Sequence, residues 1–207
     1  NIRSGLVIPA PSDVSHYLSR VMRRRDFLAF GGGHEFYASL SDDGHSISVG
    51  DDTGRADPSG NITLMFAPIK RTDDLLNMAT QMGVAAFQPV ITDHTVALHI
   101  NWSRMQKIIT ESAEQSGRNS VPLLLPPQKF SELDLSQIVF ADERAAYGAE
   151  IPNSARNARF VLVGPEGGFS DAEFSALDSS GAIGISLGKT ILRAELAAAI
   201  AISRITE

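Results

Sequence analysis

The stretch that decides the fold is FVLVGPEGGFSDAE, residues 160–173. Its four leading apolar residues are typical of a strand buried on both faces, and they run directly into a glycine-rich turn. Glycines let the backbone approach a ligand closely and leave amide N–H groups free to point at it. Ser170 and Glu173 have the spacing of a capping box, so we expect a helix to begin at Asp171. The stretch predicts a strand–turn–helix unit whose turn either binds a ligand or is a plain tight connection. The glycine spacing does not favour a Rossmann dinucleotide site.

Around this stretch, apolar runs alternate with amphipathic helical segments from Ile62 to Glu207. Such alternation predicts an α/β domain with a mostly parallel sheet. The expected strands are Ile62–Ala67, Ala86–Ile91, Val121–Leu125, Ile138–Ala141, Phe160–Val163 and Ile183–Leu187. The expected helices are Asp73–Met82, Trp102–Ser116, Asp171–Asp178 and Arg193–Ile205.

Residues 1–61 have a different pattern, with short β-type runs between clusters of Gly, Asp and Pro, which predicts a small barrel or sandwich. The segment from Asp42 to Asp57 holds five Asp and one basic residue, Arg55, and is interpreted as solvated turns. We therefore expect two domains, residues 1–61 and 62–207. The expected strands of the first are Gly5–Ile8, Phe27–Phe30, Phe36–Leu40 and Ser46–Val49.

The composition of the 207-residue chain excludes several classes of protein. It contains no cysteine, so a disulfide framework, a thiolate metal site and a catalytic cysteine are all excluded. Neither an apolar run of about 18 residues nor the pattern of a secretion signal is present, so we expect a cytoplasmic soluble protein. The net charge of −6 argues at first against a nucleic-acid partner.

The distribution of charge answers that objection. Four of the six basic residues in the first 61 are Arg20, Arg23, Arg24 and Arg25. On a helix they would lie mainly opposite an apolar face made by Val14, Leu18, Val21 and Met22. This cluster is either a solvated helix face or a local site for phosphate groups.

A second motif is GISLGKTILRAE, residues 184–195. It resembles a P-loop, but only three residues separate its glycines, whereas the Walker A motif needs four. Arg193 and Glu195 stand at the start of an Ala-rich helix, where they could form a surface ion pair. Because the N-terminal end of a helix disfavours a cation, Arg193 is misplaced there unless it serves an anionic partner.

A third segment, residues 102–118, is an amphipathic helix that should end at Gly117. Glu111, Gln115 and Arg118 could project near one another from its polar end. The simplest explanation of these polar side chains is that they are exposed to solvent.

Taken together, Gly164–Ser170, Leu187–Gly188, Ile191–Glu195, Ala113–Arg118 and the triplet His16-Tyr-Leu resemble the RsmE family, in the same order along nearly the whole chain. These enzymes methylate N3 of a uracil in small-subunit ribosomal RNA and belong to the SPOUT class. The resemblance implies a PUA-like RNA-binding β-barrel over residues 1–61 and a knotted α/β methyltransferase domain over residues 62–207. It further implies S-adenosylmethionine as cofactor, a homodimer, and 16S rRNA near the decoding region of the 30S subunit as substrate, without a metal or a membrane.

Site residues follow from the resemblance position by position. Residues 140–143 would supply the first loop around the cofactor, and residues 164–168 the second. Leu187, Gly188, Ile191 and Leu192 would supply the last. The cofactor-binding residues so implied are Ala141, Val163, Gly164, Glu166, Gly167, Gly168, Leu187, Gly188, Ile191 and Leu192. The catalytic residues are Arg193, Glu195 and Glu166, and the RNA-binding residues are His16, Arg20, Arg23, Arg24, Arg25 and Arg118.

The chain departs from the family pattern at Leu196, Met78, Gln81 and His94, which affects single contacts rather than the cofactor site. Two alternatives remain open at this point. One is a related enzyme that methylates tRNA or a ribose hydroxyl, and the other is an RNA-binding assembly factor without activity.

Overall fold

The computed structural model describes residues 2–57, 60–96, 101–153, 155 and 158–206. These residues form two compact units, the first from residues 1–59 with 113–121 and the second from residues 60–112 with 122–207. The sequence places the whole of residues 62–207 in one domain. In the structure the short segment 113–121 groups with the N-terminal residues instead.

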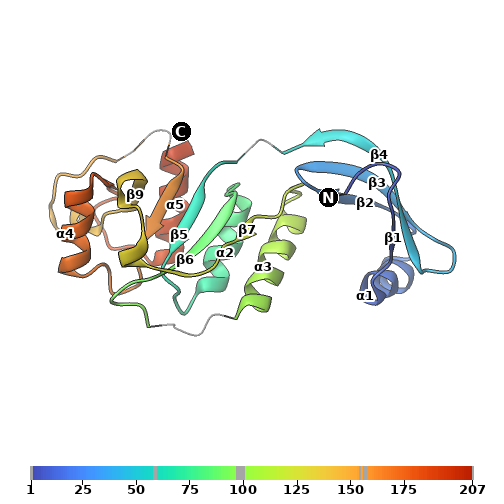
Figure 1. The fold of residues 1–207 in the computed structure, drawn as a ribbon, viewed down its shortest axis with the longest axis horizontal. Helices are drawn as coiled ribbons and strands as arrows, with labels where there is room; N and C mark the ends of the chain where they lie inside the picture. Colours follow the sequence, from blue (N-terminus) through green and yellow to red (C-terminus); the bar gives the residue numbers. More distant parts are fainter. Residues whose placement is uncertain (1, 58–59, 97–100, 154, 156–157, 207) are drawn as a thin grey trace. The chain divides into compact units, whose positions relative to one another are not determined.

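The first unit is built on a four-stranded antiparallel sheet with the order β1-β4-β3-β2 (Figure 1). Leu18, Ala38, Leu40 and Ile47 form its core. The expected barrel is therefore, in the described residues, a sheet with this linear order. Its elements are β1 (Val7–Pro9), α1 (Ser12–His16), the π-helix η1 (Tyr17–Met22), β2 (Asp26–Gly31), β3 (His34–Leu40) and β4 (Ser46–Ala56).

Two expectations for this unit are wrong. The segment 42–57 is not all turns, because β4 continues to Ala56 and pairs with β3 along its length, with register shifts around Phe36. The expected apolar helix face is also incomplete. Leu18 is buried, but Val21 and Met22 are 61% and 47% exposed. The chain changes from an α-helix to a π-helix at Tyr17, which rotates the later side chains away from the face that 3.6-residue spacing predicts.

The second unit is a parallel α/β sheet with the strand order β11-β9-β10-β5-β6-β7, and β8 also pairs with β6 (Figure 1). Every predicted strand and helix of this region is present, although the strand expected at 121–125 is reduced to β7. Its strands are β5 (Thr63–Phe66), β6 (Ala86–Ile91), β7 (Leu123–Leu124), β8 (Gln128–Lys129), β9 (Ile138–Ala141), β10 (Phe160–Val163) and β11 (Ile183–Ile185). Its helices are α2 (Thr72–Gln81), α3 (Trp102–Gln115), η2 (Phe130–Glu132), η3 (Leu135–Gln137), η4 (Glu143–Tyr147), α4 (Asp171–Ser180) and α5 (Ala194–Thr206).

Helices cover both faces of this sheet. Met65, Phe140 and Leu162 are register partners on three strands, and they pack with Leu177 of α4 on one face. On the other face α5 packs against α2, β9 and β10. Because the strands are buried from both sides, their sequences are continuous apolar runs rather than alternating ones. The part of the chain that the structure describes contains no helix long and apolar enough to cross a membrane.

Two loops of this unit are joined by hydrogen bonds. Ser186, just after β11, donates its backbone N–H to the carbonyl of Pro152 at 2.6 Å. Arg204 of α5 donates from Nη1 to the carbonyls of Asn153 and Ser186, at 2.8 Å each. These bonds hold Pro152 and Asn153, which precede β10, to the segment that follows β11. The trefoil knot that the resemblance implies stays a prediction.

Candidate functional site

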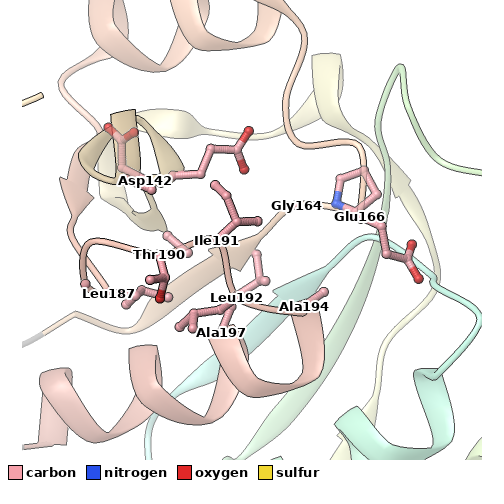
Figure 2. Close-up of a pocket in the computed structure, with 15 residues that line it drawn as sticks. Asp142, Gly164, Glu166, Leu187, Thr190, Ile191, Leu192, Ala194 and Ala197 are labelled. Carbon is pink, nitrogen blue, oxygen red and sulfur yellow. The ribbon is translucent and has the colours of Figure 1, made fainter. Parts of the chain in front are cut away.

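A pocket of the second unit lies at the carboxyl ends of three adjacent parallel strands, β11, β9 and β10. In open α/β sheets this edge is the usual place for a ligand. The loop after each strand contributes one wall, and the start of α5 closes the pocket (Figure 2). The empty space, including its open mouth, is about 550 Å³.

The pocket brings together most of the residues that the resemblance selects for the cofactor. Figure 2 shows Ile191 in the middle of the labelled residues, between Asp142 on one side and Glu166 on the other. Gly167 and Gly168 do not line the pocket, although they complete the turn that carries Glu166. The predicted cofactor residues that do line it are Ala141, Val163, Gly164, Glu166, Leu187, Gly188, Ile191 and Leu192.

Other lining residues were not selected from the sequence as cofactor-binding. Ala194 and Ala197 come from the first turn of α5 and line the pocket with small side chains. The run of alanines after Arg193 is the sequence feature that could have indicated these two lining residues. Asp142, Glu143 and Pro165 lie in the first two loops that the resemblance implied, and the remaining lining residues are Ala146 and Thr190.

The glycine-rich turn of residues 164–168 is held in place by Phe169 and by His94. A Cβ on Gly164 would lie 3.2 Å from the ring of Phe169, which packs edge-on against Phe140 and Phe174. Gly168 has a φ of +68°, which favours glycine. The Nδ1–H of His94 donates to the carbonyls of Gly167 and Gly168, 3.1 Å from each. His94, one of the positions at which the chain departs from the family pattern, therefore holds the turn in place.

The predicted capping box is confirmed. Ser170 Oγ accepts from the N–H of Glu173 at 3.2 Å, and Glu173 Oε2 accepts from the N–H of Ser170 at 2.9 Å. The other oxygen of Glu173 accepts from the N–H of Asp93 at 2.9 Å. The buried Glu173 thus ties the start of α4 to the loop after β6 and limits the movement of the glycine turn.

A network of charged groups supports the first loop. Arg144 donates to both carboxylate oxygens of the buried Asp142 and to both oxygens of Asp178. Its guanidinium also stacks on Phe174, 4.4 Å from the ring centre. These bonds hold the pKa of Asp178 below its usual value and raise that of Arg144. Asp142 is therefore held rigidly at the pocket wall.

The predicted catalytic residues have three different environments. Glu166 is exposed and lines the pocket. Arg193 is exposed directly before α5, between the lining residues Leu192 and Ala194, and its side chain forms no hydrogen bond or ion pair within the described residues. Glu195 is 6% exposed and lies 3.7 Å from Nη1 of Arg71, so it is not paired with Arg193.

The predicted RNA-binding residues of the first unit divide into two groups. His16, Arg20, Arg23, Arg24 and Arg25 are all exposed. Arg23 has a left-handed backbone (φ 52°), which is uncommon for a long side chain, and it ends the π-helix. Arg24 stands at the edge of a hollow that is also lined by Met22, Leu28 and Tyr37.

Arg118 lies elsewhere in that unit, with only 13% of its side chain exposed. Its Nη2 donates to Ser120 Oγ at 3.1 Å, and its Nε is 4.0 Å from Asp57 Oδ2. Burial lowers the pKa of Arg118, while Asp57 opposes that shift. Glu111, which the sequence groups with Gln115 and Arg118, forms an ion pair with Lys107.

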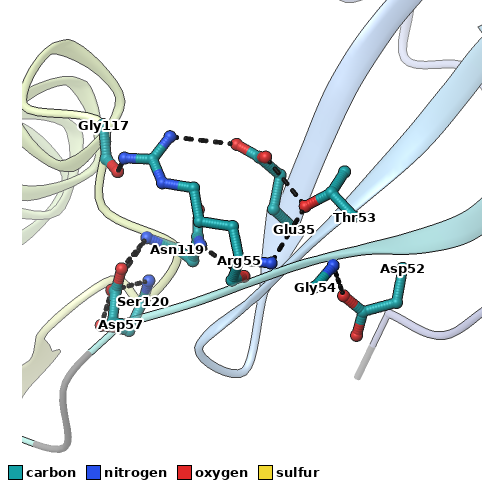
Figure 3. Close-up of polar contacts among 9 residues, drawn as sticks. All are labelled: Glu35, Asp52, Thr53, Gly54, Arg55, Asp57, Gly117, Asn119 and Ser120. Carbon is teal, nitrogen blue, oxygen red and sulfur yellow. Dashed lines mark hydrogen bonds and ion pairs between the residues drawn. The ribbon is translucent and has the colours of Figure 1, made fainter.

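Asp57 is the centre of a second network that the sequence did not indicate (Figure 3). Its carboxylate accepts from the backbone N–H groups of Asn119 and Ser120 and from Ser120 Oγ, at 2.7–2.9 Å. Asn119 is 1% exposed and donates to the carbonyl of Arg55. The polar segment after α3 is therefore held to the end of β4 and is not simply exposed, as the sequence suggested.

Comparison with known proteins identifies the family. A family model described as an RNA methyltransferase domain matches residues 56–206. A ribosomal RNA small subunit methyltransferase E of Synechocystis sp. is 32% identical over 214 residues, covering 92% of this chain and 69% of the relative. The chain belongs to the RsmE family.

Further members of the RsmE family agree with this assignment. The one from Rickettsia conorii is 32% identical over 92% of this chain and 85% of its own length. A crystal structure from Neisseria gonorrhoeae, bound to S-adenosylmethionine, superposes with a TM-score of 0.79. It is 28% identical in sequence, and the match covers 98% of this chain and 92% of that one.

Proposed function

We propose that this RsmE-family protein uses S-adenosylmethionine to methylate N3 of one uridine in 16S rRNA, near the decoding region of the 30S subunit. The observation that carries the proposal is the pocket at the ends of β9, β10 and β11. Three of the segments that carry the family resemblance, Gly164–Ser170, Leu187–Gly188 and Ile191–Glu195, contribute to its walls. Its relatives of the same family are named as ribosomal RNA small subunit methyltransferases.

The pocket suits an adenosine-containing sulfonium compound. Val163, Leu187, Ile191 and Leu192 give it apolar walls for a flat base. Gly188 (φ +135°) brings bare backbone to its edge. The chemistry that the bound cofactor supplies is a methyl group on a positively charged sulfur, ready for transfer to a nucleophile.

The residues of this chain have to make N3 of uracil nucleophilic. Methylation of a ring carbon commonly needs a cysteine adduct, and this chain has no cysteine. N3 has a usable lone pair once its proton is lost, so it needs no covalent intermediate. We assign to Arg193 the stabilisation of the negative charge that then spreads over the uracil carbonyls. Its guanidinium is exposed beside the pocket and has no ion-pair partner among the described residues, which supports that role.

Of the two carboxylates among the predicted catalytic residues, Glu166 is better placed to accept the N3 proton. It is exposed and lines the pocket, so it can exchange a proton with solvent. Glu195 is buried against Arg71. We therefore assign Glu195 to positioning the start of α5, and with it Arg193.

We propose that the first unit binds the RNA backbone through its arginine cluster. Arg20, Arg23 and Arg24 are exposed and form no ion pair within the described residues, whereas Arg25 pairs with Asp42. Exposed cations concentrated in this way suit phosphates, so RNA binding should be strongly salt-dependent. Arg118 is better explained as part of the Asp57 network. Because N3 lies on the pairing edge of uracil, the target base must also be unstacked.

A homodimer is part of the same proposal. Ile191 and Leu196 flank the start of α5 with 57% and 45% of their surface exposed, and a second copy could cover them. Light scattering on the purified protein at micromolar concentration should give twice the mass of the 22.2 kDa chain. A monomer would remove this part of the proposal.

The activity is tested with 30S subunits from a strain that lacks the enzyme. Incubation with labelled S-adenosylmethionine, followed by nuclease digestion and mass spectrometry, should give one 3-methyluridine per 16S rRNA. Methylation of tRNA or of a ribose hydroxyl instead would identify the related enzyme class. Binding to the subunits without methyl transfer would indicate an assembly factor.

A further inference from the structure

The charges around the cofactor pocket are unbalanced. Three of its lining residues are acidic, namely Asp142, Glu143 and Glu166, and none of the lining residues in the described part of the chain is basic. A ligand that carries positive charge should therefore be favoured there over a neutral one of similar shape.

The three acidic groups contribute unequally to this field. Asp142 is paired with Arg144, which donates to both of its oxygens at 2.9 and 2.7 Å and is shared with Asp178. Glu166 is exposed, so solvent screens much of its charge. Glu143 is half-buried, and within the described residues its carboxylate accepts no hydrogen bond and forms no ion pair. Among the three lining carboxylates, Glu143 is therefore the one that is partly shielded from solvent and, within the described residues, has no directly bonded cation.

The position of Glu143 is fixed by the glycine-rich turn. A Cβ on Gly168 would lie 2.8 Å from Cδ of Glu143, so the carboxylate rests directly on the backbone of that glycine. Burial raises the pKa of Glu143, and repulsion from Asp142 adds to the rise, while His94 and Arg144 oppose it. A carboxylate that is costly to ionise gains from a cation placed beside it.

We propose that Glu143 makes the pocket selective for the cationic sulfonium cofactor over its neutral thioether product. This inference rests on the proposed function and adds a specificity-determining residue to it. When the methyl group moves to N3, the sulfur keeps the electron pair of the broken bond and loses its positive charge. The attraction to Glu143 then ends, which favours release of S-adenosylhomocysteine.

The test compares the dissociation constants of S-adenosylmethionine and S-adenosylhomocysteine by calorimetry at low salt. Glu143→Gln keeps the size of the side chain and removes its charge. We expect it to weaken S-adenosylmethionine binding about tenfold and to change S-adenosylhomocysteine binding less than about twofold, since one charge pair near a protein surface is worth roughly a factor of ten. Glu150→Gln, at an exposed position outside the pocket, is the matched control and should change neither constant.

Two further measurements test whether the charge of Glu143 causes the preference for the sulfonium compound. Glu143→Asp retains the charge and should retain most of the preference, even if Glu143→Gln proves unstable. In the wild type, raising the salt concentration should lower the affinity for the sulfonium compound more than the affinity for the thioether. An unchanged affinity ratio in folded Glu143→Gln, with both compounds still bound, would overturn the role of Glu143 alone. If the wild type binds neither compound, the proposed function itself fails.

Discussion

The guanidinium of Arg144 forms a two-pronged pair with the carboxylate of Asp142, with Nε 2.9 Å from Oδ1 and Nη2 2.7 Å from Oδ2. Only 1% of the Asp142 side chain is exposed, against 34% for Arg144. The pair therefore combines a buried anion with a cation that still reaches solvent. Its partial exposure reduces the electrostatic gain, but Asp142 depends on it because a buried charge without a partner is costly.

Replacing Arg144 by Ala should lower the free energy of unfolding by about 2 kcal/mol, somewhat less than the loss for a fully buried pair. Urea denaturation at pH 7 measures the change. Arg104→Ala is the control, because Arg104 also pairs with an aspartate, Asp73, but does so at the surface. The control should lose much less stability. Equal losses in the two variants would show that the burial of Asp142 has no special cost.

Asp57 should make the first unit sensitive to acid. Burial alone would raise its pKa, but the hydrogen bonds from Asn119 and Ser120, helped by Arg118, lower the pKa below its usual value. A carboxylate with a depressed pKa stabilises the fold above its unfolded pKa of about 3.9 and loses that contribution as the pH falls through its folded pKa. We therefore expect stability to drop below about pH 4.

The substitution Asp57→Asn measures how much the Asp57 carboxylate contributes to the free energy of unfolding. The variant should be less stable than the wild type by about 1–2 kcal/mol at pH 7, because an amide accepts the bonds from Asn119 and Ser120 less well than a carboxylate. The difference should shrink toward pH 3 in a series of urea titrations. Asp43→Asn is the control, since Asp43 also has a lowered pKa but is fully exposed. A difference between wild type and Asp57→Asn that stays constant with pH would contradict the assignment.

Local features of the fold were predictable from the sequence. The capping box of Ser170 and Glu173 spans four residues, and its geometry follows from the spacing alone. The strands of the second unit were predictable because a sheet covered on both faces requires unbroken apolar runs. The predicted residues that line the pocket followed from the resemblance and not from periodicity.

The missed features depend on contacts between distant residues. Asp57 and Asn119 are 62 positions apart, and no local pattern relates them. Asp178 reaches Arg144 across 34 positions. The change from α-helix to π-helix at Tyr17 alters the spacing on which the predicted apolar face relied. These networks place segment 113–121 in the first unit and hold the first pocket loop, so sequence motifs alone did not reveal them.

Gly184 should tolerate no side chain. A Cβ at this position would lie 2.6 Å from Oδ2 of Asp142 and 3.1 Å from the ring of Phe140. Gly184→Ala should therefore displace Asp142 from Arg144 and lower the free energy of unfolding by about 1–3 kcal/mol. Gly148→Ala is the comparison, because a Cβ there meets nothing within 4 Å and adds only the strain of a positive φ. Thermal unfolding followed by circular dichroism separates the two, and a smaller loss for Gly184→Ala than for Gly148→Ala would count against the predicted clash.

Arg193 should affect turnover and not cofactor binding. It lies outside the pocket lining, while Leu192 and Ala194 on either side of it line the pocket. If its guanidinium stabilises charge that develops on uracil, Arg193→Ala should lower kcat by about 100-fold or more, as the loss of one such donor does in other enzymes. The dissociation constant of S-adenosylmethionine should change less than about threefold, because no contact with the cofactor is removed. Single-turnover methylation of 30S subunits and calorimetry measure the two quantities on the same preparation.

Arg193→Lys keeps the charge but not the planar pair of donors, so it should recover only part of the rate. Full activity in Arg193→Ala would remove this residue from the mechanism, whereas equal losses in rate and cofactor affinity would reassign it to binding.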